Sequence, residues 1–60
     1  MPKILVVDDE PSILNLVTSY LKAEGYEVYT ASDGLAALKA VKAYMPELVI
    51  LDIMLPGLEG

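Results

Sequence analysis

Several residue types that usually carry chemistry or cross-links are absent from this sequence of 60 residues. It contains no Cys and no His, so disulfide bonds are excluded and a zinc site is not expected. Its four basic residues are all Lys, against nine acidic residues. The net charge of -5 argues against direct binding to nucleic acid or to an anionic membrane surface. Apolar runs such as Ile4–Val7 and Leu48–Leu51 have only four residues and are too short to cross a bilayer.

The composition nevertheless favours a folded chain in the cytoplasm. With 55% hydrophobic residues, the sequence has enough apolar surface to offset the entropy cost of ordering. Its first residues lack the apolar segment of a signal peptide, so we expect a cytoplasmic location. The length is the difficulty, because a fold of this size buries only about 60% of its unfolded surface and often needs a partner.

Short strand-like and longer helix-like segments alternate along the chain. Residues 3–7 are apolar on both faces after Lys3, as in a central parallel strand. Pro11 suits a helix start, Gly25 a helix end, and Pro46 stops the second helix. The spacing predicts a strand over 3–7, a helix over 11–24, a strand over 26–30, a helix over 34–44, a strand over 48–52 and a loop over 53–60.

The second predicted helix has two apolar features that we expect to contribute to the core. A stripe of larger side chains recurs at helical spacing, and alanines between them allow close packing against a sheet. The larger residues are Leu35, Leu38, Val41 and Met45. Asp33 precedes this helix and is predicted to be its N-cap rather than part of a chemical site.

The order strand–helix–strand–helix–strand predicts an α/β fold with three parallel strands. Crossovers between parallel strands are right-handed in nearly all proteins, so an order of 2-1-3 places one helix on each face of the sheet. The first and third strands are then neighbours, and the carboxyl ends of such strands are where open α/β sheets bind ligands.

Three aspartates are predicted to meet at this edge: Asp8 and Asp9 after the first strand, and Asp52 at the end of the third. Like charges at short range repel one another, and a divalent cation relieves that repulsion. Mg²⁺ prefers a few carboxylates, a carbonyl oxygen and water. Asp9, Asp52 and a main-chain oxygen just after Asp52 offer such a set. A carboxylate beside the metal is then a candidate nucleophile toward a phosphoryl group.

Two segments of this chain are similar to the signatures of response regulator receiver domains. They are KILVVDDE at 3–10 and LVILDIMLPGLEG at 48–60. Between them, GY at 25–26, Ala31, DG at 33–34 and AAL at 36–38 also fit the family pattern. The chain most resembles receivers attached to winged-helix transcription factors, and the likeness covers its whole length.

This resemblance implies a flavodoxin-like fold and a role in two-component signalling. It implies that Asp52 is the phosphoacceptor and that Asp9, Asp52 and the Met54 main-chain carbonyl bind Mg²⁺, with Asp8 acting on the metal through water. It also implies a histidine kinase as phosphoryl donor, and no enzymatic activity of the module as such.

The chain departs from the family because it corresponds to the N-terminal half of a receiver. The fourth-strand Ser or Thr and the fifth-strand Lys of the family are not in the sequence, so we expect weak Mg²⁺ binding and little phosphorelay activity. A structural half-fold that assembles into a two-fold homodimer is the alternative, because the apolar third strand would be an edge. An aspartyl hydrolase is disfavoured by Met54 at the position of its second Asp. The lack of Gly at 8–11 disfavours a dinucleotide site.

Overall fold

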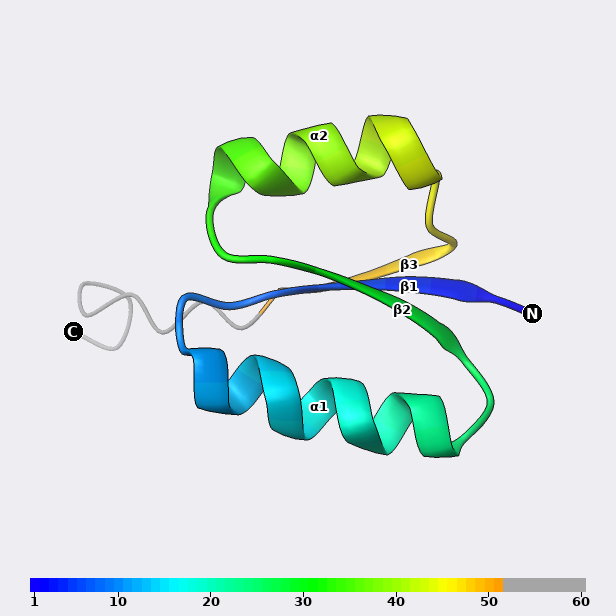
Figure 1. Ribbon diagram of the computed structural model, residues 1–60. Helices are drawn as coiled ribbons and strands as arrows, with labels where there is room; N and C mark the ends of the chain where they lie inside the picture. The colour runs from blue at the N-terminus through cyan, green and yellow to red at the C-terminus, as the bar shows by residue number, and fades with distance from the viewer. Residues whose placement is uncertain (52–60) are drawn as a thin grey trace, which may run out of the picture.

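The computed structural model describes residues 1–51 and shows three strands and two helices (Figure 1). In chain order they are β1 (Lys3–Val7), α1 (Pro11–Ala23), β2 (Glu27–Ala31), α2 (Gly34–Tyr44) and β3 (Leu48–Leu51). The predicted end of the third strand at residue 52 and the predicted loop over 53–60 lie outside the described residues. Within residues 1–51, neither helix has the length and apolar character needed to span a membrane.

The strands form one parallel sheet in the order β2-β1-β3, with β1 in the centre. Helix α1 covers one face of this sheet and α2 covers the other, so the sheet lies between two single-helix layers (Figure 1). This arrangement confirms the predicted α/β fold, its strand order and the placement of one helix on each face.

Helix α1 ends one residue earlier than predicted and closes with a left-handed glycine. Gly25 has a φ of 93°, a conformation that a side chain disfavours. Its N–H donates to the Lys22 carbonyl, and the Tyr26 N–H donates to the Leu21 carbonyl. These two bonds satisfy carbonyls that the helix itself leaves free.

The same helix end displaces β2 by one residue from its predicted range. Because the Tyr26 N–H is used by α1, the first ladder bond of β2 comes from the Glu27 N–H, which donates to the Pro2 carbonyl. The strand therefore covers 27–31 rather than 26–30. Capping of the preceding helix, rather than strand propensity, sets this boundary.

One cluster of the core lies between the sheet and α2, and it is built on small helical residues. Leu5 in β1 is fully buried and packs with Ala31 and Ala40. Ala36 and Ala37 also contact this cluster, so the alanine face of α2 lies on the sheet. Alanine permits this close approach because it has no side chain beyond Cβ.

The larger stripe of α2 does not pack on the sheet, contrary to the prediction. Leu35, Leu38 and Met45 are 66%, 61% and 78% exposed, and Val41 is also exposed. The helix has two apolar faces, one of large side chains and one of alanines. The alanine face lies on the sheet.

Candidate functional site

The predicted acidic site begins at the carboxyl-terminal end of β1. Asp8 and Asp9 directly follow Val7, the last residue of that strand. Val7 is in register with Leu51, the last residue of β3. The two strand ends that the sequence predicted to meet therefore lie side by side.

Asp8 is held in a fixed and buried position. Its N–H donates to the Ala31 carbonyl at 3.1 Å, which ties the residue to the end of β2. Its Oδ1 accepts from the Glu10 N–H at 2.9 Å, a local bond that aspartate commonly makes two residues on. The residue is only 5% exposed. Both the backbone and one carboxylate oxygen thus fix the side chain.

The second carboxylate oxygen of Asp8 has no hydrogen-bond partner within the described chain. Oδ2 is buried, and no donor from residues 1–51 reaches it. A buried carboxylate oxygen is costly to leave unpaired, and a cation or a cation-bound water is the type of group that would satisfy it. The donor set therefore fits a hard divalent metal at this edge.

Asp9 differs from Asp8 because its side chain is exposed to solvent. A metal ligand must be reachable from solution, and Asp9 meets that condition beside the buried Asp8. Within residues 1–51, no three His, Cys, Asp or Glu residues are close enough to hold a metal together. Asp52 and Met54, the remaining predicted ligands, lie outside the described residues.

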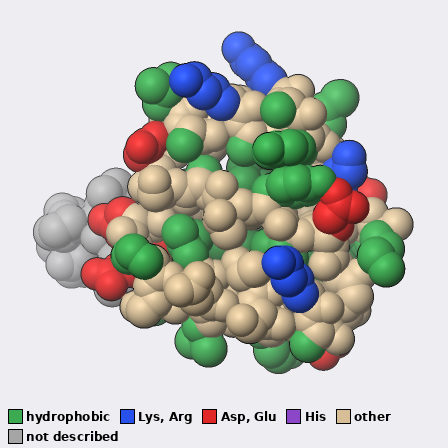
Figure 2. Space-filling view, viewed as in Figure 1, with side chains coloured by type: hydrophobic (Ala, Val, Ile, Leu, Met, Phe, Trp, Pro, Cys, Tyr) green, Lys and Arg blue, Asp and Glu red, His purple; other side chains and the backbone are tan. Residues whose placement is uncertain are grey.

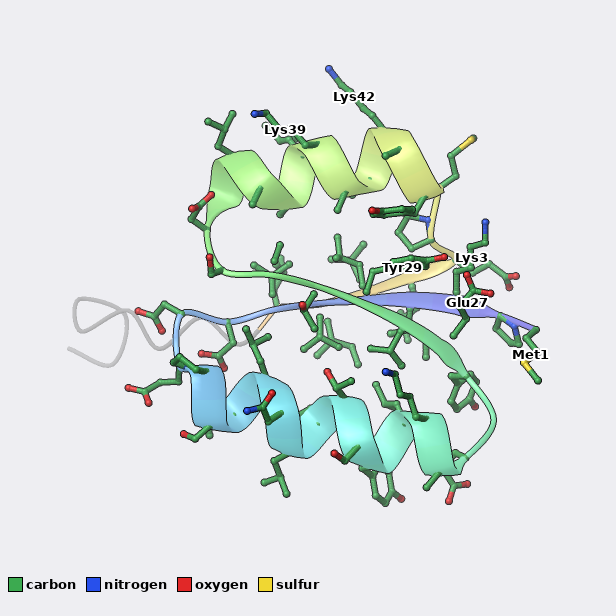
Figure 3. All side chains as sticks on the ribbon, viewed as in Figure 1. Met1, Lys3, Glu27, Tyr29, Lys39 and Lys42 are labelled. Carbon is green, nitrogen blue, oxygen red and sulfur yellow. The ribbon has the colours of Figure 1, made fainter. Side chains whose placement is uncertain are left out.

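The lysines on α2 and β1 do not neutralise this site. Lys3 begins β1 at the other end of the strand, and its Nζ donates to the Tyr44 carbonyl at 3.4 Å. Lys39 and Lys42 project from α2 (Figure 3). No ion pair joins a lysine to Asp8 or Asp9 among the described residues, so the acidic pair keeps its charge available for a cation.

Asp33 has the structural role that the sequence predicted for it. It is the N-cap of α2, and its Oδ1 accepts from the Ala36 N–H at 2.7 Å. Helix α1 has no comparable side-chain cap, because Glu10 occupies its N-cap position without such a bond. Pro11 begins α1 instead, where a missing N–H costs nothing.

A hollow of about 250 Å³ is lined by residues of α2 and β2. Thr30, Ala36, Lys39 and Tyr44 are among them. The lining includes one lysine and no carboxylate, so it does not offer cation ligands.

A tyrosine pair lies beside β2, near the end of the sheet opposite the acids. The rings of Tyr29 and Tyr44 stack with centroids 4.0 Å apart and planes 11° from parallel. The Tyr29 hydroxyl donates to a Glu27 carboxylate oxygen. This bond to an anion, with partial burial and the nearby negative charge, raises the pKa of Tyr29 above its ordinary value of 10.0.

The family resemblance assigned different roles to the two adjacent aspartates, and the structure adds a difference in their surroundings. Asp8 is buried and bonded, and Asp9 is exposed. The sequence carried no signal for this difference, because β1 is buried on both faces and alternation along it does not separate an inner from an outer side.

Comparison with known proteins connects this fold to one family. The parallel sheet in the order β2-β1-β3, with one helix on each face, is typical of the flavodoxin-like class. A family model for the response regulator receiver domain matches residues 4–60. The chain belongs to the receiver domain family, whose members are signalling modules.

Curated relatives of high similarity are bacterial regulators. The alkaline phosphatase synthesis transcriptional regulatory protein PhoP of Bacillus subtilis is 55% identical over 58 residues, which cover 97% of this chain and 24% of PhoP. The DNA-binding response regulator MtrA of Mycolicibacterium smegmatis is 48% identical, with 97% of this chain and 25% of MtrA covered. This chain thus spans about a quarter of these relatives.

In the matched solved structures, this chain spans about half of the matched chain. The chemotaxis response regulator CheY4 of Vibrio cholerae matches with a TM-score of 0.85 and 41% identity, over 93% of this chain and 47% of CheY4. A complex of histidine kinase ThkA with response regulator protein TrrA gives a TM-score of 0.82 and 53% identity, over 95% of this chain and 49% of the matched chain.

Proposed function

We propose that this chain is part of a phosphoacceptor receiver of two-component signal transduction. In this proposal Asp52 accepts the phosphoryl group, and a histidine kinase is the donor, as the ThkA–TrrA complex suggests by analogy. Asp9, Asp52 and the Met54 main-chain carbonyl bind Mg²⁺, and Asp8 acts through a metal-bound water. The module works in signalling rather than as an enzyme in its own right.

The observation that carries this proposal is the buried Oδ2 of Asp8, which has no hydrogen-bond partner within residues 1–51 and lies where β1 and β3 end together. A turn-forming aspartate would need only its Oδ1 bond to the Glu10 N–H. The turn does not account for the buried Oδ2 of Asp8, whereas a bound cation with its waters does.

In the proposed reaction, a carboxylate oxygen of Asp52 forms a bond to phosphorus. The bond from phosphorus to the donor breaks, and the donor retains its electron pair. Mg²⁺, when bound, offsets the negative charge of the phosphoryl oxygens. Asp8 and Asp9 hold negative charge at the metal side of the site, and the hydrogen bonds of Asp8 keep its carboxylate oriented.

For these sixty residues alone, we expect weak Mg²⁺ binding and little stable phosphorylation. The family's fourth-strand hydroxyl and fifth-strand lysine meet the phosphoryl charge, and no residue from them is in this sequence. Removing one such donor typically lowers a rate by about 10²–10³. Incubation with acetyl phosphate and Mg²⁺, followed by intact-mass measurement, should show little added phosphate. Stoichiometric labelling that Asp52→Asn abolishes would contradict this limit.

Mg²⁺ titration by calorimetry tests the metal site directly. Asp8→Asn and Asp9→Asn should each weaken binding by about tenfold or more, since groups that hold or orient a metal have effects of this size. Asp33→Asn is the matched control, because it removes the same charge while asparagine still caps α2. Equal affinity in Asp8→Asn, Asp9→Asn and Asp33→Asn would refute the site.

We propose self-association as a second property of the sixty-residue chain, with a two-fold homodimer as the product. Strand β3 supports it, because Leu48 and Leu51 are 53% and 55% exposed although the strand is wholly apolar. Light scattering over a range of concentrations tests this property. A monomer mass at every concentration would contradict it.

A further inference from the structure

Two tyrosine rings stack beside β2, and several contacts hold each of them in place. Tyr29 lies in β2 and packs against the core cluster beneath α2, and Tyr44 is the last residue of α2. The Lys3 ammonium donates to the Tyr44 carbonyl at 3.4 Å, which links the end of α2 to β1. Figure 3 shows Tyr29 between the sheet and the C-terminal end of α2, with Glu27 and Lys3 nearby. The pair is therefore built by β1, β2 and α2 together.

The geometry of this pair brings carbon atoms of the two rings into contact. The ring centroids are 4.0 Å apart, and the planes are 11° from parallel. Facing carbon atoms in such a stack lie at about the 3.5–4.0 Å contact distance of non-bonded carbons. Groups held together in this way react as though their concentration were far above any reached in solution. Because the p orbitals of an aromatic ring project from its faces, those of each ring point toward the other ring.

Glu27 provides an acceptor for the proton of one of the two hydroxyls. The Tyr29 hydroxyl donates to a Glu27 carboxylate oxygen, and Glu27 is exposed to solvent. A phenol that loses one electron becomes strongly acidic and transfers its proton to a hydrogen-bonded base. The Glu27 carboxylate is placed to accept that proton and to pass it on to water. Removal of an electron from Tyr29 is therefore faster than removal from a tyrosine without such a base.

The sequence offers few competing targets for a one-electron oxidant. It contains no Cys and no Trp, so tyrosine is its most readily oxidised side chain. Tyr20 and Tyr26 are exposed, and neither stacks on another ring among residues 1–51. Figure 2 shows hydrophobic side chains at the surface between α2 and the sheet. Tyr44 is 42% exposed, so an oxidant in solution can reach the stacked pair.

We propose that Tyr29 and Tyr44 form a site of oxidative modification, at which a one-electron oxidant such as a peroxide-derived radical produces a dityrosine cross-link within one chain. Each tyrosine gives one electron to the oxidant and loses its hydroxyl proton, that of Tyr29 to Glu27 and that of Tyr44 to water. Two equivalents of the oxidant are reduced, and two phenoxyl radicals face each other in the stack.

The two radicals then combine into one covalent bond. Each contributes one electron to a bond between ring carbons that lie next to the hydroxyl-bearing carbons. The hydrogens on the two joined carbons move through water to the phenolic oxygens, which restores both aromatic rings and both hydroxyls. In total the chain loses two electrons and two protons, and its mass falls by two hydrogens.

Photo-oxidation of the whole sixty-residue chain tests this proposal. Ruthenium tris-bipyridyl with persulfate generates tyrosyl radicals under visible light. Intact-mass measurement should show a monomer lighter by two hydrogens, in a yield that does not change on dilution. Cleavage after lysine should leave residues 23–39 joined to residues 43–60, the fragments that contain Tyr29 and Tyr44.

Phenylalanine variants remove a hydroxyl and keep the ring, so the fold is retained, which circular dichroism verifies. Tyr29→Phe and Tyr44→Phe should each lower the yield of cross-linked monomer by about tenfold or more, since the remaining tyrosines are not held in contact. Tyr26→Phe is the matched control, because Tyr26 lies on the same fragment as Tyr29, and it should keep the wild-type yield. Equal yields in Tyr29→Phe and Tyr26→Phe, or cross-links between chains alone, would overturn the site.

A second comparison tests the role of Glu27 as the proton acceptor. Glu27→Gln should lower the initial rate of cross-linking, because an amide does not take up the proton of Tyr29. Glu24→Gln removes the same charge at the end of α1 and should react at the wild-type rate. Equal rates in Glu27→Gln and Glu24→Gln would overturn this role.

Discussion

Strands β1 and β3 have nearly the same composition and very different environments. β1 reads KILVV and β3 reads LVIL. In β1, Ile4, Leu5 and Val6 are at most 4% exposed, whereas in β3 Leu48 and Leu51 are more than half exposed. The difference arises because β1 has a neighbouring strand on each side and a helix over each face, while β3 has one strand neighbour among residues 1–51.

This comparison shows that an apolar strand predicts a need for cover and does not show that the cover is present. Burial of an apolar side chain contributes roughly 1.5–3 kcal/mol relative to exposure. Leu5 receives that contribution within the described chain, and Val49 receives only part of it. Within residues 1–51, the side chains of β3 therefore contribute less to stability than those of β1.

The largest expected loss of stability comes from truncating a core residue of β1, compared with the same kind of change in β3. Leu5→Ala should lower the free energy of unfolding by about 2–5 kcal/mol, because it leaves a cavity in the core. Val49→Ala should cost about 1 kcal/mol or less in dilute solution, because its side chain is partly exposed. Urea unfolding followed by circular dichroism measures both. Equal losses of unfolding free energy in Leu5→Ala and Val49→Ala would contradict the difference in burial between β1 and β3.

A second pair of variants tests whether α2 packs on the sheet through its alanine face. Ala40→Leu should destabilise the fold by about 1–3 kcal/mol, because the buried alanine leaves no room for a larger side chain. Leu38→Ala, on the exposed stripe, should change stability by no more than about 0.5 kcal/mol. The same unfolding assay applies. A larger loss in Leu38→Ala than in Ala40→Leu would mean that the other face of α2 is the packed one.

Loss of the N-terminal cap of α2 should lower the stability of the fold by less than a change in the core does. Asp33→Ala removes the acceptor of the Ala36 N–H and should cost about 1 kcal/mol. Asp33→Ser keeps a capping oxygen and should lose much less. Thermal melts of the two variants measure the difference, and identical midpoints would show that the cap does not support α2.

The smallest effect concerns the β2 edge, which unlike β3 carries polar groups. The folded state holds the Tyr29 proton more tightly than the unfolded state, since its pKa is raised above 10.0. The stabilisation is therefore complete below pH 10 and is lost as pH rises through the folded-state pKa. In an absorbance titration, Glu27→Gln should lower the pKa of Tyr29 toward its ordinary value, so the variant should ionise earlier than the wild type. Identical titration curves for the wild type and Glu27→Gln would contradict this.

The fold could be predicted from the sequence because its signals are local. Both faces of residues 3–7 are apolar, Pro11 and Gly25 mark the limits of the first helix, and the right-handed crossover rule places one helix on each face for a strand order of 2-1-3. The start of β2 was missed by one residue because the Tyr26 N–H caps α1. That bond depends on three-dimensional geometry at the end of a helix.

The position of the candidate site could be predicted from the sequence, but the burial and hydrogen bonding of its side chains could not. Two acids after β1 and one after the third strand indicate a shared edge, since parallel strands end together. The burial of Asp8 and its unpartnered Oδ2 depend on how β1, β2 and the turn before α1 close around it. No pattern of residue types along the chain contains that information.

The sequence by itself determined the strands, the helices, their order and the edge at which the acids lie, because periodicity, capping residues and chain handedness act locally. Tertiary structure alone decided which face of α2 meets the sheet. The alanines of α2 lie against the sheet, and Leu35 and Leu38 do not, because close contact between a helix and a sheet favours small side chains. Tertiary structure also decided that β1 is buried and β3 is open, because burial depends on how many neighbours surround a strand and not on the strand's own residues.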